Sequence, residues 1–328
     1  MMYSDSNSKY RLLGGIVMGA ALAGVAAWAV SNMLRQEFQP QQSDSTLDNK
    51  GGESVDNEAI PDKDGVFSVV MNTYEVAGVT DPGKRRANNQ DFFRLGELEL
   101  AGETHTLAVV CDGMGGHAGG EVASKIASDV IWSVLSKQSG GDLQALHQTM
   151  SEALERADAA IEQRASKDRD LEGMGTTAVI AAINHDQYVH CYLGDSRLYH
   201  LSGDTFVYQT KDHSVVRFLV EEGIIGPEEA KDHPYRSQLT SSLGGGPNAN
   251  RLTIEPKWDG KDSPLRDWKS GDWLVLCSDG LNSELEDLEI AQVLKASQDA
   301  REAALKLREK VLDTEARDNV TVIVARKF

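Results

Sequence analysis

The stretch YVHCYLGDSRLYHLSGDTFVYQ, residues 188–209, alternates short apolar runs with turn-forming residues. The runs cover residues 188–193, 196–201 and 205–209 and are rich in the tyrosine, valine and leucine typical of buried strands. Gly194-Asp195 separates the first two runs, and Ser202-Gly203-Asp204 separates the last two. Connections this short join antiparallel neighbours, so the stretch predicts three successive, antiparallel strands.

Both flanks of this stretch contain more apolar runs and also helical patterns. Buried strands are predicted at residues 107–111, 176–183, 273–277 and 320–324. Apolar residues at helical spacing predict two core-facing stripes, one at Leu143, Leu146, Met150, Leu154, Ala157 and Ile161, the other at Val122, Ile126, Val130 and Val134. Strand clusters interrupted by helix clusters favour an α+β fold, with sheets covered by helices, over a regular βαβ alternation.

The composition is that of a globular, acidic protein. The chain has 328 residues, 40% hydrophobic, and 33 lysines and arginines against 51 aspartates and glutamates, for a net charge of −18. This balance argues against nucleic acid as a partner, because cationic side chains supply that affinity. Without its N-terminal region the chain fits one domain of roughly 250 residues.

The N-terminal region predicts a membrane anchor. Residues 12–30 contain no charge and are close to the ~20 residues that span a bilayer. We therefore expect a tail at 1–11, one transmembrane helix at 12–34, a disordered polar linker at 35–71 and a folded domain at 72–328. A cleaved signal peptide is the alternative, since Ala27 and Ala29 form an A-x-A pattern.

Small residues recur every four positions in this segment, at Gly15, Gly19, Ala23 and Ala27. Such spacing lets two membrane helices approach closely and suggests a homodimer. The flanking charges, Lys9 and Arg11 before the segment and Arg35 after it, weakly favour an N-terminus inside the cell.

Acidic residues mark the ends of three predicted strands. Asp112 and Asp279 follow apolar runs, and Asp318 precedes the last one. Carboxylates at such places either cap turns or converge on a metal. Mg²⁺ and Mn²⁺ prefer oxygen ligands, so strand ends gathered at one edge would suit two such ions, although spacing alone does not show convergence.

Seven stretches in chain order resemble the motifs of a known family, the metal-dependent Ser/Thr protein phosphatases of type 2C, or PPM family, in their bacterial form. They are TDPGKRRANNQD (80–91), VCDGMGGH (110–117), GTT (175–177), GDSR (194–197), KDHS (211–214), CSDGL (277–281) and RDNVT (317–321). The resemblance covers residues from about 75 to 328. It implies an αββα sandwich of two antiparallel sheets flanked by helices.

The resemblance also implies the site and its chemistry. Two Mg²⁺ or Mn²⁺ ions would be held by Asp91, Asp112, the Gly113 carbonyl, Asp279 and Asp318, and a third, weaker ion by Asp195. Arg86 would hold the substrate phosphate while a hydroxide between the metals attacks phosphorus in line. Substrates would be phosphoserine and phosphothreonine proteins, opposite a Ser/Thr kinase, and by analogy the domain would face the cytoplasm.

Four positions depart from the family pattern. Gln90 stands where many members have glutamate, and Met114 where eukaryotic members have a histidine proposed as general acid. His117, three residues later, is the candidate proton donor, against the alternative that it only shapes the loop. In the flap segment 233–244, Ser237 and Ser241 replace the expected asparagine and arginine.

Other functions compete with this interpretation. Cys191 to Arg197 matches the Cys-x5-Arg signature of cysteine-dependent phosphatases, but a strand follows it where that chemistry needs a helix. Residues 78–84 resemble a P-loop and residues 113–118 a dinucleotide fingerprint, each with an unsuitable neighbour. A catalytically silent membrane sensor of the same fold is the remaining alternative.

The chain has three cysteines, Cys111, Cys191 and Cys277, each within or at the end of an apolar run. We expect them to be buried in strands rather than to form a disulfide framework or a structural zinc site.

Overall fold

The computed structural model describes residues 58–59, 61–116, 118–246 and 252–328. Strand β4 (Glu103–Met114) is the centre of one sheet, in which every pairing is antiparallel. Its partners are β3 (Asp91–Leu100), β5 (Gly175–Thr176) and β6 (Ala178–Ile183), and the sheet continues through β7 (Gln187–Leu193), β10 (Leu243–Gly244) and β11 (Leu265–Asp267). We call it the β4 sheet.

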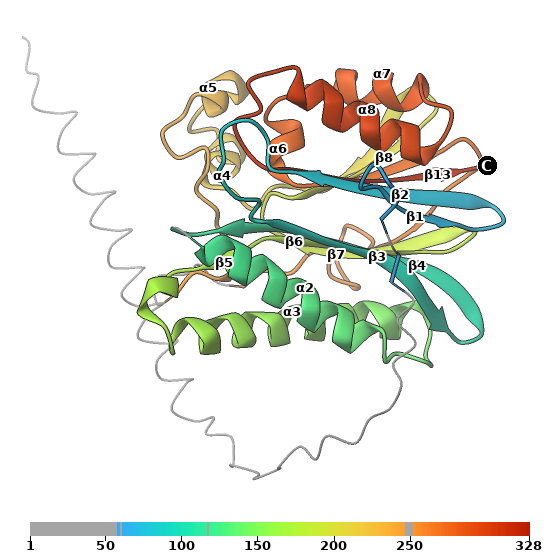
Figure 1. Ribbon diagram of the computed structural model, residues 1–328, viewed down its shortest axis with the longest axis horizontal. Helices are drawn as coiled ribbons and strands as arrows, with labels where there is room; N and C mark the ends of the chain where they lie inside the picture. The colour runs from blue at the N-terminus through green and yellow to red at the C-terminus, as the bar shows by residue number, and fades with distance from the viewer. Residues whose placement is uncertain (1–57, 60, 117, 247–251) are drawn as a thin grey trace, which may run out of the picture. The chain divides into compact units, whose positions relative to one another are not determined.

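The second sheet, which we call the β13 sheet, is also antiparallel and lies face to face with the first (Figure 1). Its order is β1 (Phe67–Val70), β2 (Tyr74–Asp81), β13 (Val320–Lys327), β12 (Trp273–Cys277), β8 (Arg197–Ser202) and β9 (Thr205–Gln209). The expected sandwich of two antiparallel sheets is therefore confirmed.

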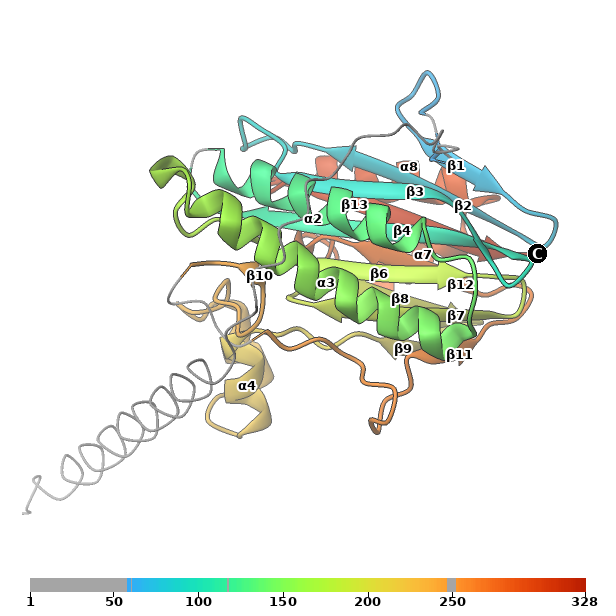
Figure 2. The same ribbon diagram turned by 90° about the horizontal axis from the view of Figure 1, so that it is seen from below.

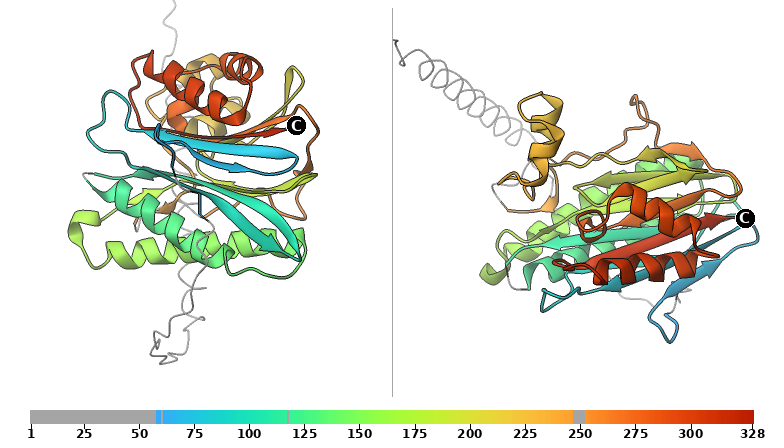
Figure 3. Two further views of the ribbon diagram at one scale, coloured as in Figure 1. Left: turned by 45° about the vertical axis from the view of Figure 1, so that its right-hand side comes forward. Right: turned by 90° about the horizontal axis from the view of Figure 1, so that it is seen from above.

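Helices cover the outer face of each sheet. Helices α2 (Gly119–Leu135) and α3 (Leu143–Ala165) lie across the β4 sheet (Figure 2). Helices α7 (Asp287–Lys295) and α8 (Ala300–Leu312) cover the β13 sheet, with α6 (Asp279–Asn282) beside them (Figure 3). A 3-10 turn at Arg169–Leu171 follows α3, and α4 (Val215–Glu221) and α5 (Pro227–Lys231) lie at the end of the sandwich away from the C-terminus.

The core consists of three apolar layers, which explains why the central strands are hydrophobic on both faces. Along β4, Leu107 and Val109 point to the helices α2 and α3, whereas Ala108 and Val110 point into the layer between the sheets. A third layer lies between the β13 sheet and α7 and α8. All three cysteines are buried and free, as expected.

The two helical stripes fare differently. The stripe on α3 is confirmed, with Leu146, Met150, Leu154, Ala157 and Ile161 buried. The predicted stripe on α2 is confirmed only in part: its four residues pack against the core but are only partly buried. The buried face of α2 instead carries glycine, alanine and serine with Ile131 and Leu135. These small residues let the helix approach β3 and β4 closely.

The predicted pairing of residues 188–193 with 196–201 is also wrong. Strand β7 pairs with β6 and β11, whereas β8 pairs with β9 and β12 of the other sheet. The connection at Gly194-Asp195 therefore carries the chain from one sheet to the other. Both strands are buried on both faces, so each needs neighbours within its own sheet. The run at residues 176–183 is likewise split in two at Thr177.

The ordered domain begins before residue 72. Ala59 N donates to Leu95 O at 2.8 Å, and β1 lies in what the sequence predicted to be linker. Acidic residues of this segment form ion pairs with two arginines of the domain, Glu58 with Arg94 and both Asp62 and Asp64 with Arg301. The predicted transmembrane helix and its small-residue stripe lie outside the described residues. Within the described ranges, no helix is long and apolar enough to cross a membrane.

One tyrosine joins the two sheets through a buried hydrogen bond. The Tyr74 hydroxyl on β2 donates to the Ile183 carbonyl on β6 at 2.8 Å and lies 3.1 Å from the Thr106 hydroxyl on β4.

We expect Tyr74→Phe to lower the free energy of unfolding by about 1–3 kcal/mol, because the buried Ile183 carbonyl and Thr106 hydroxyl each lose a hydrogen-bond partner. Urea denaturation of the two proteins measures this difference. Tyr235→Phe, at an exposed tyrosine, is the matched control, and equal midpoints for all three proteins would contradict the prediction.

Candidate active site

Five aspartates from both sheets meet at one edge of the sandwich. Asp91 begins β3 and lies directly opposite Asp112 of β4 in the register of the β4 sheet. Asp279 follows β12, and Asp318 comes just before β13. Strands β12 and β13 are neighbours in the β13 sheet. Asp195 belongs to the connection between the sheets. The sequence motifs, far apart in the chain, are thus brought together.

Burial and mutual repulsion make this cluster unfavourable without a counter-charge. Burial, with repulsion from Asp279 and Asp318, raises the pKa of Asp91 to about 7. Burial also raises the pKa of Asp279 to about 6, with a further contribution from Asp318. The pKa values of Asp112 and Asp195 are raised well above the usual range, first by burial and then by neighbouring carboxylates.

Asp91 is held by a short polar chain between the sheets. The side chain is 6% exposed, and one of its carboxylate oxygens accepts from the Ser278 hydroxyl at 2.6 Å. The same hydroxyl accepts from the Thr321 backbone N–H at 3.0 Å. Ser278 belongs to the β12 end and Thr321 to β13, so the β13 sheet orients a carboxylate of the β4 sheet.

Gly113 is glycine because the backbone is crowded there. A Cβ at this position would lie 2.2 Å from the Gly120 carbonyl oxygen of α2 and 2.5 Å from the Gln90 carbonyl oxygen. The Gly113 N–H donates to that Gln90 carbonyl at 3.1 Å. The close approach of α2 therefore fixes the backbone whose carbonyl the resemblance assigns to metal binding.

Asn319 holds the loop that carries Arg86. Its side-chain oxygen accepts from the Gln90 N–H at 2.8 Å, and its amide nitrogen donates to the carbonyls of Pro82 and Asn88, both at 2.9 Å. The residue is only 3% exposed, so these hydrogen bonds are shielded from water. The loop 82–90 is thereby closed over the start of β13.

Arg86 points at the aspartate cluster. One guanidinium nitrogen lies 2.6 Å from a carboxylate oxygen of Asp318, and the side chain is 48% exposed. Its charge also acts to lower the pKa of Asp279. The exposed guanidinium has further donors available for a phosphate at this edge.

A second ion pair stands beside Asp195. Two nitrogens of Arg197 donate to the two carboxylate oxygens of Asp212, each at 2.7 Å. Asp212 contributes to the raised pKa values of Asp195 and Asp279, and Arg197 partly offsets the pKa rise at Asp195. The pair is held in place by a third donation, from Arg197 to the Tyr199 hydroxyl.

The donor set fits hard divalent cations. All its atoms are oxygens, four of the five carboxyl groups have a raised pKa, and a cation would relieve their repulsion. Among the residues that the structure describes, no three acidic, histidine or cysteine side chains already converge as the ligands of one ion do. The carboxylates instead hydrogen-bond to Ser278 and Arg86.

Two of the departures from the family pattern are explained by the structure. The Gln90 side chain packs against α2, since a Cβ on Gly120 would lie 2.9 Å from its Cδ. Ser241 is buried and exchanges hydrogen bonds with the Thr253 backbone at 2.9 and 3.1 Å, so this serine ties down the base of the flap. His117 lies outside the described residues, and its role as proton donor stays a prediction.

Two of the competing motifs, the Cys-x5-Arg signature and the P-loop-like segment, lack the structure that their chemistry needs. Cys191 lies within β7, fully buried in the layer beneath α2 and α3, and burial raises the pKa of its thiol. Arg197 is engaged by Asp212 and begins a strand rather than a helix. The P-loop-like segment ends in strand β2 and a turn at Gly83, and no helix follows it.

Sequence reasoning missed most of the supporting residues. Thr177 is one: its hydroxyl accepts from the Asp112 N–H at 3.1 Å and lies 2.7 Å from the Ser196 hydroxyl. Ser196, Ser278 and Asn319 are others, each beside a predicted ligand, and so are Asp212 and His213 of the KDHS motif. Their presence within quoted motifs was the only available signal, because their partners are remote in sequence.

Comparisons with known proteins agree with this geometry. The family described as protein phosphatase 2C matches residues 83–312. The serine/threonine protein phosphatase PstP of Mycobacterium tuberculosis is 38% identical over 76% of this chain, although the chain spans only 44% of that protein. The serine/threonine phosphatase stp of Listeria innocua is 32% identical over 76% of this chain and 94% of its own length.

Solved structures show the same similarity. The M. tuberculosis PstP structure matches with a TM-score of 0.64 and 35% identity, over 78% of this chain and 99% of that one. A PstP catalytic domain in complex with two manganese ions matches with a TM-score of 0.63 and 33% identity, over 77% and 98%. With the strand-end aspartates gathered at one edge of the sandwich, these matches show that the chain belongs to the protein phosphatase 2C family.

Proposed function

We propose that this protein is a metal-dependent phosphatase that hydrolyses phosphoserine and phosphothreonine esters on proteins. The observation that carries the proposal is that five aspartates from both sheets lie at one edge of the sandwich, beside an exposed arginine. Relatives named as serine/threonine phosphatases support the substrate class, since one of them is matched over 94% of its length.

We further propose that the site binds two Mn²⁺ or Mg²⁺ ions through Asp91, Asp112, the Gly113 carbonyl, Asp279 and Asp318, and a weaker third ion through Asp195. The two manganese ions in the structure of a PstP catalytic domain support the first two. Such cations, when bound, lower the pKa of water and offset charge on a phosphate, which is the chemistry that hydrolysis of a phosphate ester requires.

The protein's own residues bind and orient the substrate. Arg86 stands at the exposed side of the cluster, where its planar fork of donors suits two phosphate oxygens. Asn319 closes the loop that carries Arg86, and these hydrogen bonds hold the guanidinium near the cluster. All three cysteines are buried, so none of their thiols is placed to act as the nucleophile.

The cellular setting is proposed from the sequence alone. Residues 12–34 would anchor the chain in a membrane as a single span, with the phosphatase domain in the cytoplasm, opposite a Ser/Thr kinase. A homodimer through Gly15, Gly19 and Ala23 would follow from their small-residue spacing. Protease protection of membrane vesicles tests which side the domain occupies.

The first test is an assay on a phosphothreonine peptide with Mn²⁺, with excess EDTA, and after thiol alkylation. We expect activity that requires Mn²⁺, disappears in EDTA and survives alkylation, because the cysteines are buried. Activity that alkylation abolishes and EDTA spares would instead favour the Cys191 mechanism. No activity under any condition would favour the silent sensor.

Asp279→Asn should separate catalysis from stability. We expect activity to fall at least ~10³-fold, because a metal ligand loses its charge. The pKa of Asp279 is raised to about 6, so ionisation of the folded, metal-free protein costs stability as pH rises from about 4 through 6. The neutral amide removes this cost, so the metal-free variant should unfold at a higher urea concentration than wild type at pH 7.5.

The control for this variant is Asp259→Asn, at an exposed aspartate away from the cluster, which should change neither activity nor stability. Undiminished turnover in Asp279→Asn would contradict the metal assignment. A lower unfolding midpoint without metal would contradict the electrostatic account of the cluster.

Arg86→Ala should weaken the use of substrate phosphate. Loss of a charge-assisted contact of roughly 3 kcal/mol predicts a fall of about 10²-fold in kcat/KM, measured by steady-state kinetics on the same peptide. The neighbouring exposed Arg85 offers the matched control, and Arg85→Ala should keep near wild-type kinetics. An equal effect of both substitutions would show that only the overall positive charge matters.

A further inference from the structure

Residues 214–239 contain α4, α5 and the first part of the segment 233–244; we call them the flap, and they join the sandwich through a narrow neck. An antiparallel bridge between Ser214 and Leu239 closes the neck. Just outside it, the Thr240 N–H donates to the His213 carbonyl at 2.7 Å. His213 therefore lies where both ends of the flap meet the sandwich.

His213 also holds the connection that carries Asp195. Its backbone N–H donates to the Gly194 carbonyl at 2.8 Å, and its Nδ1 lies 3.3 Å from the Gly194 N–H, which donates to it. Gly194 has φ +93°, and a Cβ there would lie 2.6 Å from the Thr177 methyl group. The residue before Asp195 is thus fixed from two sides, by His213 and by Thr177.

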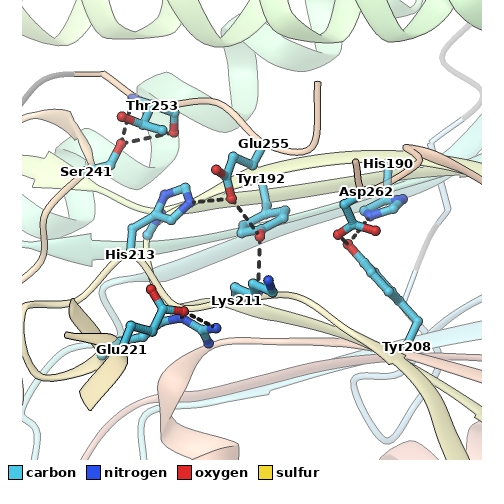
Figure 4. Close-up of polar contacts among 12 residues, drawn as sticks. His190, Tyr192, Tyr208, Lys211, His213, Glu221, Ser241, Thr253, Glu255 and Asp262 are labelled. Atoms are coloured by element: carbon cyan, nitrogen blue, oxygen red, sulfur yellow. Dashed lines mark hydrogen bonds and ion pairs between the residues drawn. The ribbon is translucent and has the colours of Figure 1, made fainter. Parts of the chain in front are cut away.

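These contacts determine the tautomer of the His213 ring. A backbone N–H only donates, so Nδ1 must be the unprotonated nitrogen and Nε2 must carry the hydrogen. Nε2 points to a carboxylate oxygen of Glu255 at 3.3 Å, and the same oxygen accepts from the Tyr192 hydroxyl at 3.2 Å. Figure 4 shows His213 and Tyr192 both directed at the Glu255 carboxylate.

The ring is also held by stacking and by the backbone around it. His213 stacks on Tyr192 with centroids 5.2 Å apart and planes inclined by 28°. The Lys211 N–H donates to the Tyr192 hydroxyl at 3.1 Å, and the backbones of Tyr192 and Glu255 exchange two hydrogen bonds. With its side chain 10% exposed, His213 has little freedom to adopt another rotamer.

On the side of the flap, α4 is not closely packed against the segment that follows Glu255. A cavity of about 490 Å³ separates α4 from the segment that follows Glu255, and Arg217, Phe218 and Lys257 are among the residues that line it. The flap is therefore joined to the sandwich by hydrogen bonds at the neck and by an exposed ion pair between Lys231 of α5 and Glu286.

We propose that His213 is a positioning residue that sets the Asp195 carboxylate for metal binding and links this carboxylate to the flap. Nδ1 performs the first task through the Gly194 N–H, and Glu255 orients the ring from the opposite side. This inference rests on the proposed function, in which Asp195 binds the weakest ion.

Two substitutions separate the two nitrogens of the ring. Asparagine places an amide oxygen near the position of Nδ1, so His213→Asn keeps an acceptor for Gly194 and loses the Glu255 contact. Glutamine places its amide near Nε2, so His213→Gln keeps the Glu255 contact and leaves the Gly194 N–H without its acceptor. We expect His213→Gln to weaken the lowest-affinity Mn²⁺ site about ten- to a hundredfold, and His213→Asn to stay near wild type.

The measurements use the full chain and do not require turnover. Electron paramagnetic resonance of free Mn²⁺ gives the number and affinity of bound ions, with Asp195→Asn as the reference for a lost weak site. Hydrogen exchange of the metal-free protein reports on the Gly194 amide, which should exchange faster in His213→Gln than in His213→Asn.

The same pair of substitutions at His105 is the matched control. His105 is buried near the opposite end of β4, where it contacts Asn184, and its variants should alter neither measurement. Equal effects of His213→Asn and His213→Gln, or none from either, would overturn the proposal. A wild-type chain that binds Mn²⁺ but hydrolyses no phosphopeptide would refute the proposed function and leave the His213 comparison decisive.

Discussion

The buried amide of Asn319 is the contact on which the arrangement of the site depends. It accepts one hydrogen bond from Gln90 and donates two to the loop that carries Arg86, so its hydrogen-bonding capacity is almost fully used. Asn319 directly precedes strand β13, and Gln90 directly precedes strand β3 of the β4 sheet, so this amide ties the two sheets together at the edge where the aspartates meet. Ser278, at the end of the neighbouring strand β12, makes a second link between the sheets, because its hydroxyl donates to Asp91 and accepts from the Thr321 N–H.

A cluster of buried carboxylates is costly, and the fold gives two of its members, Asp112 and Asp195, a rigid backbone. Gly113 is confined between α2 and Gln90, and Gly194 between Thr177 and His213. These glycines permit approaches that any side chain would prevent. The aspartates that follow or precede them therefore cannot relax away from one another, and raised pKa values are the result.

The sequence predicted the ligands better than their surroundings. Asp112, Asp279 and Asp318 were recognisable because each lies next to an apolar run. Helix α3 was recognisable because six apolar residues recur at helical spacing between Leu143 and Ile161. Periodicity does not say which sheet a strand joins, so the transfer of the chain at Gly194 was missed. It also favours large apolar residues, so the small buried face of α2 was overlooked. Glu58 and Asp62 were assigned to a disordered linker because the arginines with which they form ion pairs are distant in sequence.

The passage of the chain between sheets at Gly194 has a consequence for the genetics of such a protein. The candidate ligands are divided between the sheets, so their spacing depends on the apolar layer between them, which includes Val179 and Leu276. A change of volume in that layer is therefore expected to move one half of the site against the other. Loss-of-function alleles should map to the interior as well as to the acidic edge, and the interior alleles would be recognised by weakened metal binding.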